Sequence, residues 1–375
     1  MQSIKALVLK ERGSIEFIDK KYPSILDPHG VLIQPIVVSP CTSDVHTIWQ
    51  GSPKRKNLTL GHECVGKIIE CGNDVKDFSV GDVVAVPAIT PDWGHDEVKR
   101  NPAHAGTNFS AHMLGKSIDG VFQDVFYLPH ADYNLSKIPD GVSLEQALMC
   151  VDVVTTGFTC AEEAEIKPGD TVTVMGIGAI GLSAIIGAKY YGAKKIFAVG
   201  SSPDNVKIAE NFGAEVINYK TCKCDLPDGL HPLANSTKSS VVNYVLKETG
   251  TKGVDAVLIC GGNDLTFPQA VDMVKYGTGI VSNVMYYGAS NMQDGNIDSI
   301  QIPKFSIGRG MAGKTLKFSL AKGGRQRIEF LLSLCKEKII DPSIFITKKY
   351  YGLDKIKDAI YDMKDRKAIK IAVYL

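Results

Sequence analysis

The chain has 375 residues, which at about 150 residues per domain predicts two domains. Hydrophobic residues make up 44% and charged residues 22%, values that are typical of globular proteins and exclude wholesale disorder. Lys and Arg total 42 against 41 Asp and Glu, and a net charge of +1 gives no electrostatic basis for binding nucleic acid or an anionic membrane surface. The sequence has no apolar run of about 18 residues and no signal-peptide core, so we expect a cytoplasmic protein with neither nucleic acid nor membrane as a partner.

The nine cysteines are odd in number and scattered along the chain, which argues against a disulfide framework. We therefore expect them to be core thiols or metal ligands. The one close pair is Cys222 and Cys224, and we interpret both as thiols of a loop.

The first 150 residues contain short β-type runs separated by Gly, Pro and Asp, at 31–38, 64–70, 83–87 and 121–128. This pattern predicts a largely antiparallel β domain with tight turns between its strands.

From about Asp152 the pattern changes to strands that alternate with helices. We expect strands at 171–175, 195–199, 215–219, 256–260 and 279–284, with helices at 179–191 and 204–212. Such alternation predicts a parallel, doubly wound sheet that ends near 317–325. Helices at 329–336 and 353–364 and a strand at 369–375 would return to the first domain, and residues 221–239 form a long polar loop.

A glycine-rich motif follows the predicted strand 171–175 directly and opens a helix. Its residues are Gly176, Ile177, Gly178, Ala179, Ile180 and Gly181. In this context the glycines let backbone amides approach a pyrophosphate, which the helix N-terminus also favours. The alternative is a glycine-rich connection without a ligand.

The end of the next strand bears on which dinucleotide binds. An NAD site normally has Asp or Glu there to bind the ribose 2′-hydroxyl. This chain has Gly200, Ser201 and Ser202 instead, and no carboxylate before Asp204. Small residues leave room for a 2′-phosphate, with the serines as donors, which favours NADP. NAD bound through Asp204 remains the alternative.

Several residues in the β domain are typical of a catalytic zinc site, in which three protein ligands leave one position open. They are Cys41, Ser43, His46, His62, Glu63 and Asp152. Taken singly, each residue type favours an ordinary role, with Cys41 as a core thiol, His62 as a hydrogen-bonded core histidine and Asp152 as a helix cap. Only their combination with a dinucleotide site favours zinc. The segment Pro91–Met113 contains no cysteine, so we expect no structural zinc.

These motifs together resemble the zinc-dependent medium-chain dehydrogenases/reductases, and most of all the NADP-dependent secondary-alcohol dehydrogenases of bacteria and anaerobic protists. The resemblance covers essentially the whole chain. It rests on Pro40-Cys41-Thr42-Ser43-Asp44 with His46, Leu60-Gly61-His62-Glu63, the run from Pro87 to Trp93, Asp152 before Thr155-Thr156-Gly157-Phe158, and Gly323-Gly324-Arg325. It implies an α/β fold with a GroES-like, β-barrel-type catalytic domain (1–155 and 321–375), a Rossmann domain (156–320) and a homotetramer.

The resemblance also implies a role for each site residue. Cys41, His62 and Asp152 would bind one catalytic zinc, with Glu63 as an intermittent fourth ligand, and Ser43 would pass the substrate proton to His46. Gly200, Ser201 and Tyr219 match positions that hold the 2′-phosphate in the family, and we add the Ser202 hydroxyl and the positive charge of Arg366 as further contacts to it. Val284 and Tyr286 are assigned to the cofactor, and Ala88, His112 and Tyr286 to the substrate.

Three departures from the family pattern are visible. Ser202 stands where the family has an arginine that binds the 2′-phosphate, which weakens the expected preference for NADP. The loop 221–239 is longer than the family's. His112 stands where the family has a pocket tryptophan, so we expect a larger and more polar pocket than isopropanol needs.

The leading hypothesis is therefore a zinc alcohol dehydrogenase that transfers hydride between NADP(H) and a small secondary alcohol or ketone, or an aldehyde. A polyol or amino-alcohol dehydrogenase with the same zinc core, using NAD or NADP, is the second hypothesis. The third is a non-catalytic nucleotide-binding relative without zinc, against which the retention of all four candidate ligands argues.

Overall fold

The computed structural model describes the chain except for residues 1–2, 51–55, 101–110, 232, 234 and 287–301. The chain divides into two compact units, Met1–Thr155 with Ala321–Leu375 and Thr156–Leu320. Within the described residues, no helix is long and apolar enough to cross a membrane.

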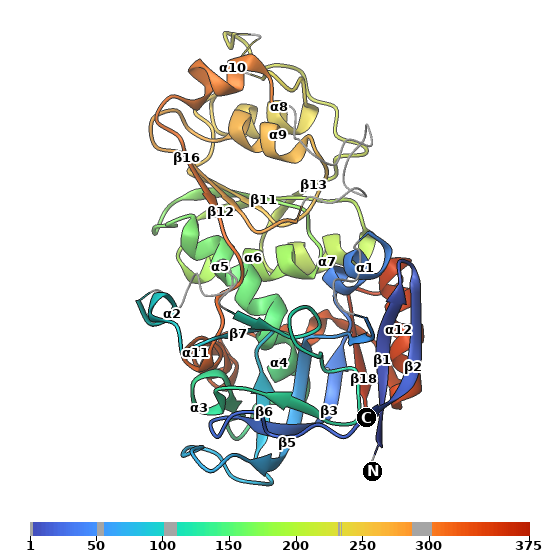
Figure 1. Cartoon of the computed structure of the whole chain (residues 1–375). Helices are drawn as coiled ribbons and strands as arrows, with labels where there is room; N and C mark the ends of the chain where they lie inside the picture. The colour runs from blue at the N-terminus through green and yellow to red at the C-terminus, as the bar shows by residue number, and fades with distance from the viewer. Residues whose placement is uncertain (1–2, 51–55, 101–110, 232, 234, 287–301) are drawn as a thin grey trace. The chain divides into compact units, whose positions relative to one another are not determined.

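The first unit is built on a seven-stranded sheet in which β9 pairs with β3 off the main path (Figure 1). Its strand order is β10 (Ser136–Lys137), β6 (Val83–Val86), β5 (Glu63–Cys71), β3 (Val31–Ser39), β18 (Lys370–Tyr374) and β17 (Ile346–Tyr351), with β9 at Phe126–Leu128. All pairings in it are antiparallel except that between β17 and β18. The expected antiparallel β domain is confirmed, and its C-terminal strand returns to it as expected.

Two smaller sheets complete the β structure of this unit. One has the order β2 (Ser14–Lys21), β1 (Ser3–Glu11) and β4 (Leu58–Thr59), and the other pairs β7 (Ile89–Pro91) with β8 (Ala111–Met113). The helices of the unit are α1 (Thr42–Trp49), α2 (Asp96–Arg100), α3 (Ala131–Asn134), α4 (Leu144–Met149), α11 (Arg325–Lys336) and α12 (Ile356–Lys364), with short 3-10 turns at Pro342–Phe345 and Leu353–Lys355.

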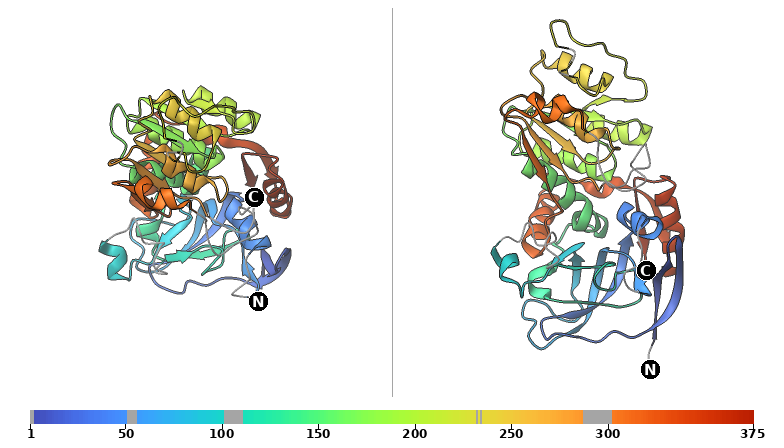
Figure 2. Two further views of the ribbon diagram at one scale, coloured as in Figure 1. Left: turned by 90° about the horizontal axis from the view of Figure 1, so that it is seen from above. Right: turned by 45° about the horizontal axis from the view of Figure 1, so that its top comes forward.

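One apolar core joins the ends of the chain in this unit. Leu7 and Leu9 of β1 belong to the same buried cluster as Ile356 and Ile360 of α12. Figure 2 shows the N-terminal hairpin, in blue, beside α12, in red. Ile356, Ala359 and Ile360 of α12 are buried at positions i, i+3 and i+4, which is the spacing of one helix face.

The second unit is a six-stranded parallel sheet. Its strand order is β13 (Glu215–Ile217), β12 (Lys195–Val199), β11 (Thr171–Met175), β14 (Ala256–Ile259), β15 (Ile280–Asn283) and β16 (Thr315–Phe318). Numbered within this unit, the order is 3-2-1-4-5-6, which is the order of a Rossmann sheet. The expected doubly wound parallel sheet is confirmed.

Helices cover both faces of this sheet, with α5, α6 and α7 on one side and α8 and α9 on the other (Figure 1). Their bounds are α5 (Thr155–Glu163), α6 (Ala179–Tyr190), α7 (Pro203–Asn211), α8 (Ser240–Glu248) and α9 (Thr266–Met273), followed by α10 (Lys304–Ile307) and a 3-10 turn at Arg309–Met311. Strand β13 is shorter than expected because the chain turns at Asn218, whose carbonyl accepts from the backbone amides of Thr221 and Cys222.

A helical segment leads from one unit to the next. Helix α4 continues without a break into a π-helix, Cys150–Val154, and then into α5. Asp152 therefore lies inside a helix, and the alternative in which it caps one is wrong.

Candidate active site

Four side chains that are far apart in the sequence converge in the first unit. Cys41 precedes α1, His62 and Glu63 stand at the start of β5, and Asp152 comes from the π-helix. One ligand atom from each residue lies within 4.8 Å of the others. His62 and Glu63 are buried, and Cys41 and Asp152 are partly buried.

The spacing of these atoms suits a tetrahedral metal ion. The distance from Cys41 Sγ to Asp152 Oδ2 is 3.4 Å, and that from His62 Nε2 to Asp152 Oδ2 is 3.7 Å. Zinc bonds of roughly 2.0–2.3 Å place tetrahedral ligands about 3.3–3.8 Å apart. Thiolate, imidazole and carboxylate together are a donor set that zinc takes.

Glu63 offers a fourth ligand in addition to Cys41, His62 and Asp152. Its Oε1 accepts a hydrogen bond from Lys370 Nζ at 2.5 Å, and the same ammonium donates to the Pro40 carbonyl at 3.0 Å. Its other oxygen, Oε2, is buried and has no hydrogen-bond partner within the described part of the chain. A buried carboxylate oxygen without a donor is costly unless a cation satisfies it, so the site fits a metal ion.

Asp44 organises two of the ligands at once. Its Oδ2 accepts from the Cys41 backbone amide at 2.9 Å, which forms a capping box with the Cys41 thiol at the start of α1. Its Oδ1 lies 3.4 Å from His62 Nδ1, which leaves His62 Nε2 for the metal. From the sequence we assigned Asp44 no role beyond its place in the family motif, although its spacing from Cys41, C-x-x-D at a helix start, is a signal for a cap.

Burial and neighbouring charges shift the pKa values of the side chains in this cluster. Burial and the Asp152 charge raise the pKa of the Cys41 thiol. Burial alone would lower the pKa of His62, but the Asp44 charge and hydrogen bonds to Asp152 and Cys41 raise it well above its usual value. Burial also raises the pKa of Glu63, to about 7, in spite of Lys370. A divalent cation stabilises the deprotonated forms of such ligands, so binding would release protons.

Ser43 and His46 lie three residues apart on α1, beside this cluster. Ser43 Oγ is 3.2 Å from His62 Nε2, and His46 Nδ1 is 3.0 Å from Gln50 Oε1. The alternative in which Ser43 and His46 cap the helix is wrong, because the Cys41 and Asp44 side chains cap it.

The glycine-rich loop of the second unit has the shape that a dinucleotide needs. Gly176 has φ +83°, and a Cβ on it would meet the Gly261 backbone at 2.6 Å. A Cβ on Gly181 would lie 1.8 Å from the Gly176 carbonyl, so this helix packs directly on the strand. Gly178 caps α6 without a side-chain hydrogen bond and faces open space, which leaves the first amides of α6 for an anion. Ile177, Ala179 and Ile180 complete the loop and the first turn of α6.

The second β–α turn lies beside this loop. A Cβ on Gly200 would strike the Ile177 side chain at 2.1 Å, so Gly200 fits closely under the loop. The Gly200 amide donates to the Ile217 carbonyl, which brings the turn after β12 next to Tyr219 after β13. Ser201 is partly buried, whereas Ser202 and Tyr219 are exposed, and Ser202 stands at the N-cap of α7 without a capping hydrogen bond.

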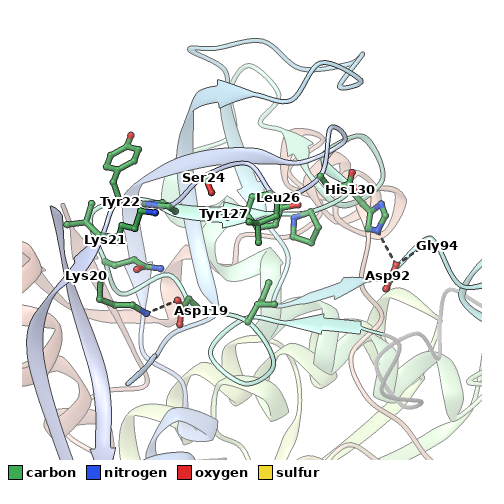
Figure 3. Close-up of a pocket in the computed structure, with 16 residues that line it drawn as sticks. Lys20, Lys21, Tyr22, Ser24, Leu26, Asp92, Gly94, Asp119, Tyr127 and His130 are labelled. Carbon is green, nitrogen blue, oxygen red and sulfur yellow. Dashed lines mark hydrogen bonds and ion pairs between the residues drawn. The ribbon is translucent and has the colours of Figure 1, made fainter. Parts of the chain in front are cut away.

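A cavity of about 710 Å³ in the first unit lies elsewhere (Figure 3). None of the four candidate ligands lines it. Two pairs of its polar side chains already contact each other, with Lys20 Nζ 2.6 Å from Asp119 and His130 Nε2 3.0 Å from Asp92. We therefore place the chemistry at the four-residue cluster.

Comparisons with known proteins agree with this geometry. The family model "Alcohol dehydrogenase GroES-like domain" matches residues 27–140, and "Zinc-binding dehydrogenase" matches residues 179–307. The chain is 42% identical to the NADP-dependent isopropanol dehydrogenase of Entamoeba histolytica, over 98% of this chain and 94% of that protein. It is 40% identical to the protein of the same name from Thermoanaerobacter brockii, over 97% of each.

The chain belongs to the zinc-binding alcohol dehydrogenase family. Among solved structures, it resembles an alcohol dehydrogenase from Thermus sp. ATN1 (TM-score 0.83, 24% identity, 99% of each chain). It also resembles the 2R,3R-butanediol dehydrogenase of Bacillus subtilis (TM-score 0.80, 25% identity, 100% of each chain). The predicted family, the GroES-like and Rossmann fold and an enzyme of the zinc-dependent oxidoreductase class are confirmed.

The remaining predicted residues of this alcohol dehydrogenase belong to different parts of the chain. Ala88 is buried, and its amide donates to the Val151 carbonyl, next to Asp152. His112 pairs with Thr90 between β7 and β8, and its side chain lies outside the described atoms. Arg366 is an exposed residue of the first unit, after α12. Val284 and Tyr286 follow β15, and Tyr286 is exposed.

Proposed function

We propose that this protein is an NADP-dependent zinc alcohol dehydrogenase that interconverts small secondary alcohols and ketones, with aldehydes as further substrates. The convergence of Cys41, His62 and Asp152, with the orphaned Glu63 oxygen behind them, is the observation that carries the proposal. The glycine-rich loop supports a dinucleotide, and the names of the relatives support NADP and isopropanol-like substrates.

Cys41, His62 and Asp152 would hold a zinc ion, which would supply a Lewis acid there, and the glycine-rich loop would hold a dinucleotide whose nicotinamide would supply the hydride chemistry. Ser43 is placed to receive the proton of the alcohol, because its hydroxyl lies beside the metal-binding nitrogen of His62. His46, on the same face of α1, carries that proton to solvent, a role for which histidine has a suitable pKa. Burial lowers the pKa of His46, which keeps the ring neutral and ready to accept a proton.

NADP is favoured over NAD because the end of β12 carries no carboxylate. Gly200, Ser201, Ser202 and Tyr219 are the residues we assign to the 2′-phosphate, and Arg366 remains a predicted contributor. The free N-cap hydroxyl of Ser202 supports this assignment. Without an arginine at that position, we expect a modest preference. The alternative is NAD bound through Asp204, which is exposed in the first turn of α7.

The residues of the pocket bear on the substrate range. Val284 and Tyr286 on the cofactor side, and Ala88 and His112 on the substrate side, are the residues assigned to the pocket. A histidine at 112 favours a polyol or amino alcohol as the second candidate substrate class. A homotetramer remains a prediction from the family resemblance, and a cytoplasmic location remains a prediction from the sequence.

A substrate panel followed at the nicotinamide absorbance, run with NADP and with NAD, tests the proposal directly. Secondary alcohols and ketones should be turned over fastest, with NADP preferred. Metal analysis of the same preparation should give one zinc per chain. A protein without zinc, or one without turnover of any alcohol, ketone or aldehyde, would instead indicate the non-catalytic nucleotide-binding alternative.

A further inference from the structure

Gln50 contacts His46, the histidine that carries the alcohol proton in the proposed reaction. It is the C-cap residue of α1, and its Oε1 lies 3.0 Å from His46 Nδ1. A side-chain amide oxygen only accepts hydrogen bonds, so His46 Nδ1 carries the hydrogen in this pair. The other ring nitrogen, Nε2, then has a lone pair and accepts protons.

Ser43, His46 and Gln50 share one helix face. Ser43, His46 and Gln50 are separated by three and then four residues, which is the spacing of neighbours along an α-helix. Ser43 stands at the metal-site end, where its hydroxyl meets His62 Nε2, and Gln50 stands at the other end. Gln50 itself is partly exposed, so this end of the helix reaches water.

We propose that Gln50 is a positioning residue that fixes the tautomer of His46, with Nδ1 protonated and Nε2 unprotonated, the form that accepts the alcohol proton. The inference rests on the proposed function. In the oxidation direction the alcohol loses hydride to NADP⁺ and a proton to His46 Nε2 by way of Ser43. The protonated ring then releases a proton to water. A ring held in the opposite tautomer presents Nε2–H and cannot accept.

The pKa of His46 responds to its contact with Gln50. Burial lowers the pKa of His46, the Gln50 hydrogen bond raises it, and the nearby positive charge of Lys116 lowers it. Replacing Gln50 by Glu puts a negative charge on the same contact and should raise the pKa of His46 by about 1–2 units. Replacing it by Met removes the hydrogen bond at similar volume and should lower the pKa.

The test uses the full-length, zinc-loaded protein and its Gln50→Glu and Gln50→Met variants. Exchange of the imidazole C2 hydrogen with deuterium, read by mass spectrometry, gives the pKa of each histidine separately. His46 should titrate in the order Met variant, wild type, Glu variant, from low to high pH. His29, an exposed histidine of the same unit, should be unchanged in all three and serves as the internal reference. Thermal unfolding checks that both variants fold.

The rate of alcohol oxidation should rise with pH at a midpoint that follows the same order of the three proteins. The midpoint should shift between proteins by the amount measured for the pKa of His46. Equal His46 titration in all three proteins would overturn the inference, because the contact would then have no influence on the ring. A shifted His46 titration with an unmoved pH profile would also overturn it, and would place the failure in the proposed proton path. A wild-type protein that oxidises no alcohol would refute the proposed function itself.

Discussion

The buried ion pair between Lys370 and Glu63 gives a prediction whose size follows from the structure. The two side chains are 3% and 0% exposed, and their N–O distance is 2.5 Å. Lys370 also donates to the Pro40 carbonyl. Lys370→Met therefore leaves a buried carboxylate without its cation and a carbonyl without its donor. Removal of one partner from a buried pair costs about 3–5 kcal/mol of unfolding free energy.

Unfolding in urea, followed by tryptophan fluorescence, measures this loss of unfolding free energy in the first unit. Trp49 and Trp93, the two tryptophans of the chain, both belong to the unit that holds the pair. Zinc content is measured in each variant, since Glu63 is also a candidate ligand.

Two further variants complete the experiment. Lys349→Met is the matched control, because Lys349 pairs with Glu145 but has a side chain that is 45% exposed; it should cost far less than Lys370→Met. Adding Glu63→Gln to Lys370→Met removes the uncompensated charge and should restore most of the stability. Equal losses in the Lys370 and Lys349 variants, or no recovery in the double variant, would refute the reasoning.

Four further predictions concern single side chains. Asp152→Asn should retain the fold and lose zinc on dialysis against a chelator, because an amide is a poorer ligand than a carboxylate; unchanged zinc content and turnover would remove Asp152 from the ligands. Ser43→Ala should lower turnover about a hundredfold with zinc retained; full turnover per zinc-loaded chain would exclude it from the proton path. Ser202→Arg should lower the KM for NADP about tenfold or more, since a charge-assisted bond to phosphate contributes roughly 1.5–3 kcal/mol; a native preference for NAD would contradict the site assignment. Hydrogen bonds from Lys348 and Tyr350 lower the pKa of Asp362 to about 2, so its stabilisation is present above about pH 4 and is lost as the pH falls through 2. Asp362→Asn should therefore cost about 1–2 kcal/mol at pH 7 and nothing near pH 2, by urea unfolding of both proteins.

The Rossmann unit shows where sequence reasoning is strongest. Strands β11 and β12 and helix α6 lie where the sequence predicted them, because each is a buried apolar run that is followed closely by glycine. The glycines stop β11 at Met175, and Tyr190 stands just before Gly192, which has φ +99°. The helices α8 and α9 were not predicted. Helix α9 contains Pro268 and buries nearly all of its residues, so it has no polar face to reveal a helical period.

Only part of the candidate metal site could be predicted from the sequence. Cys41, His62 and Glu63 stand next to turn residues where strands end or begin, and such positions are visible in a sequence. Lys370 was missed, because a lysine in a strand predicts a solvent-facing position. Here its ammonium is directed into the core by Glu63 and the Pro40 carbonyl. A contact across 307 residues leaves no local signal in the sequence around either partner.

Asp152 is the residue for which local rules fail most clearly, and the reason is structural. Its neighbours Val151, Val153 and Val154 are β-branched and typical of a strand, yet the segment is a π-helix between α4 and α5. All three valines are buried, whereas the Asp152 carboxylate meets Cys41 and His62. A single π turn inside an α-helical segment changes the direction of the side chains that follow, and such turns are frequent at functional sites. In a regular α-helix from Leu144 to Glu163, the Asp152 side chain would point in a different direction around the helix axis relative to the side chains of α4. The irregular turn is therefore what allows one helix both to pack against the core and to supply the third ligand.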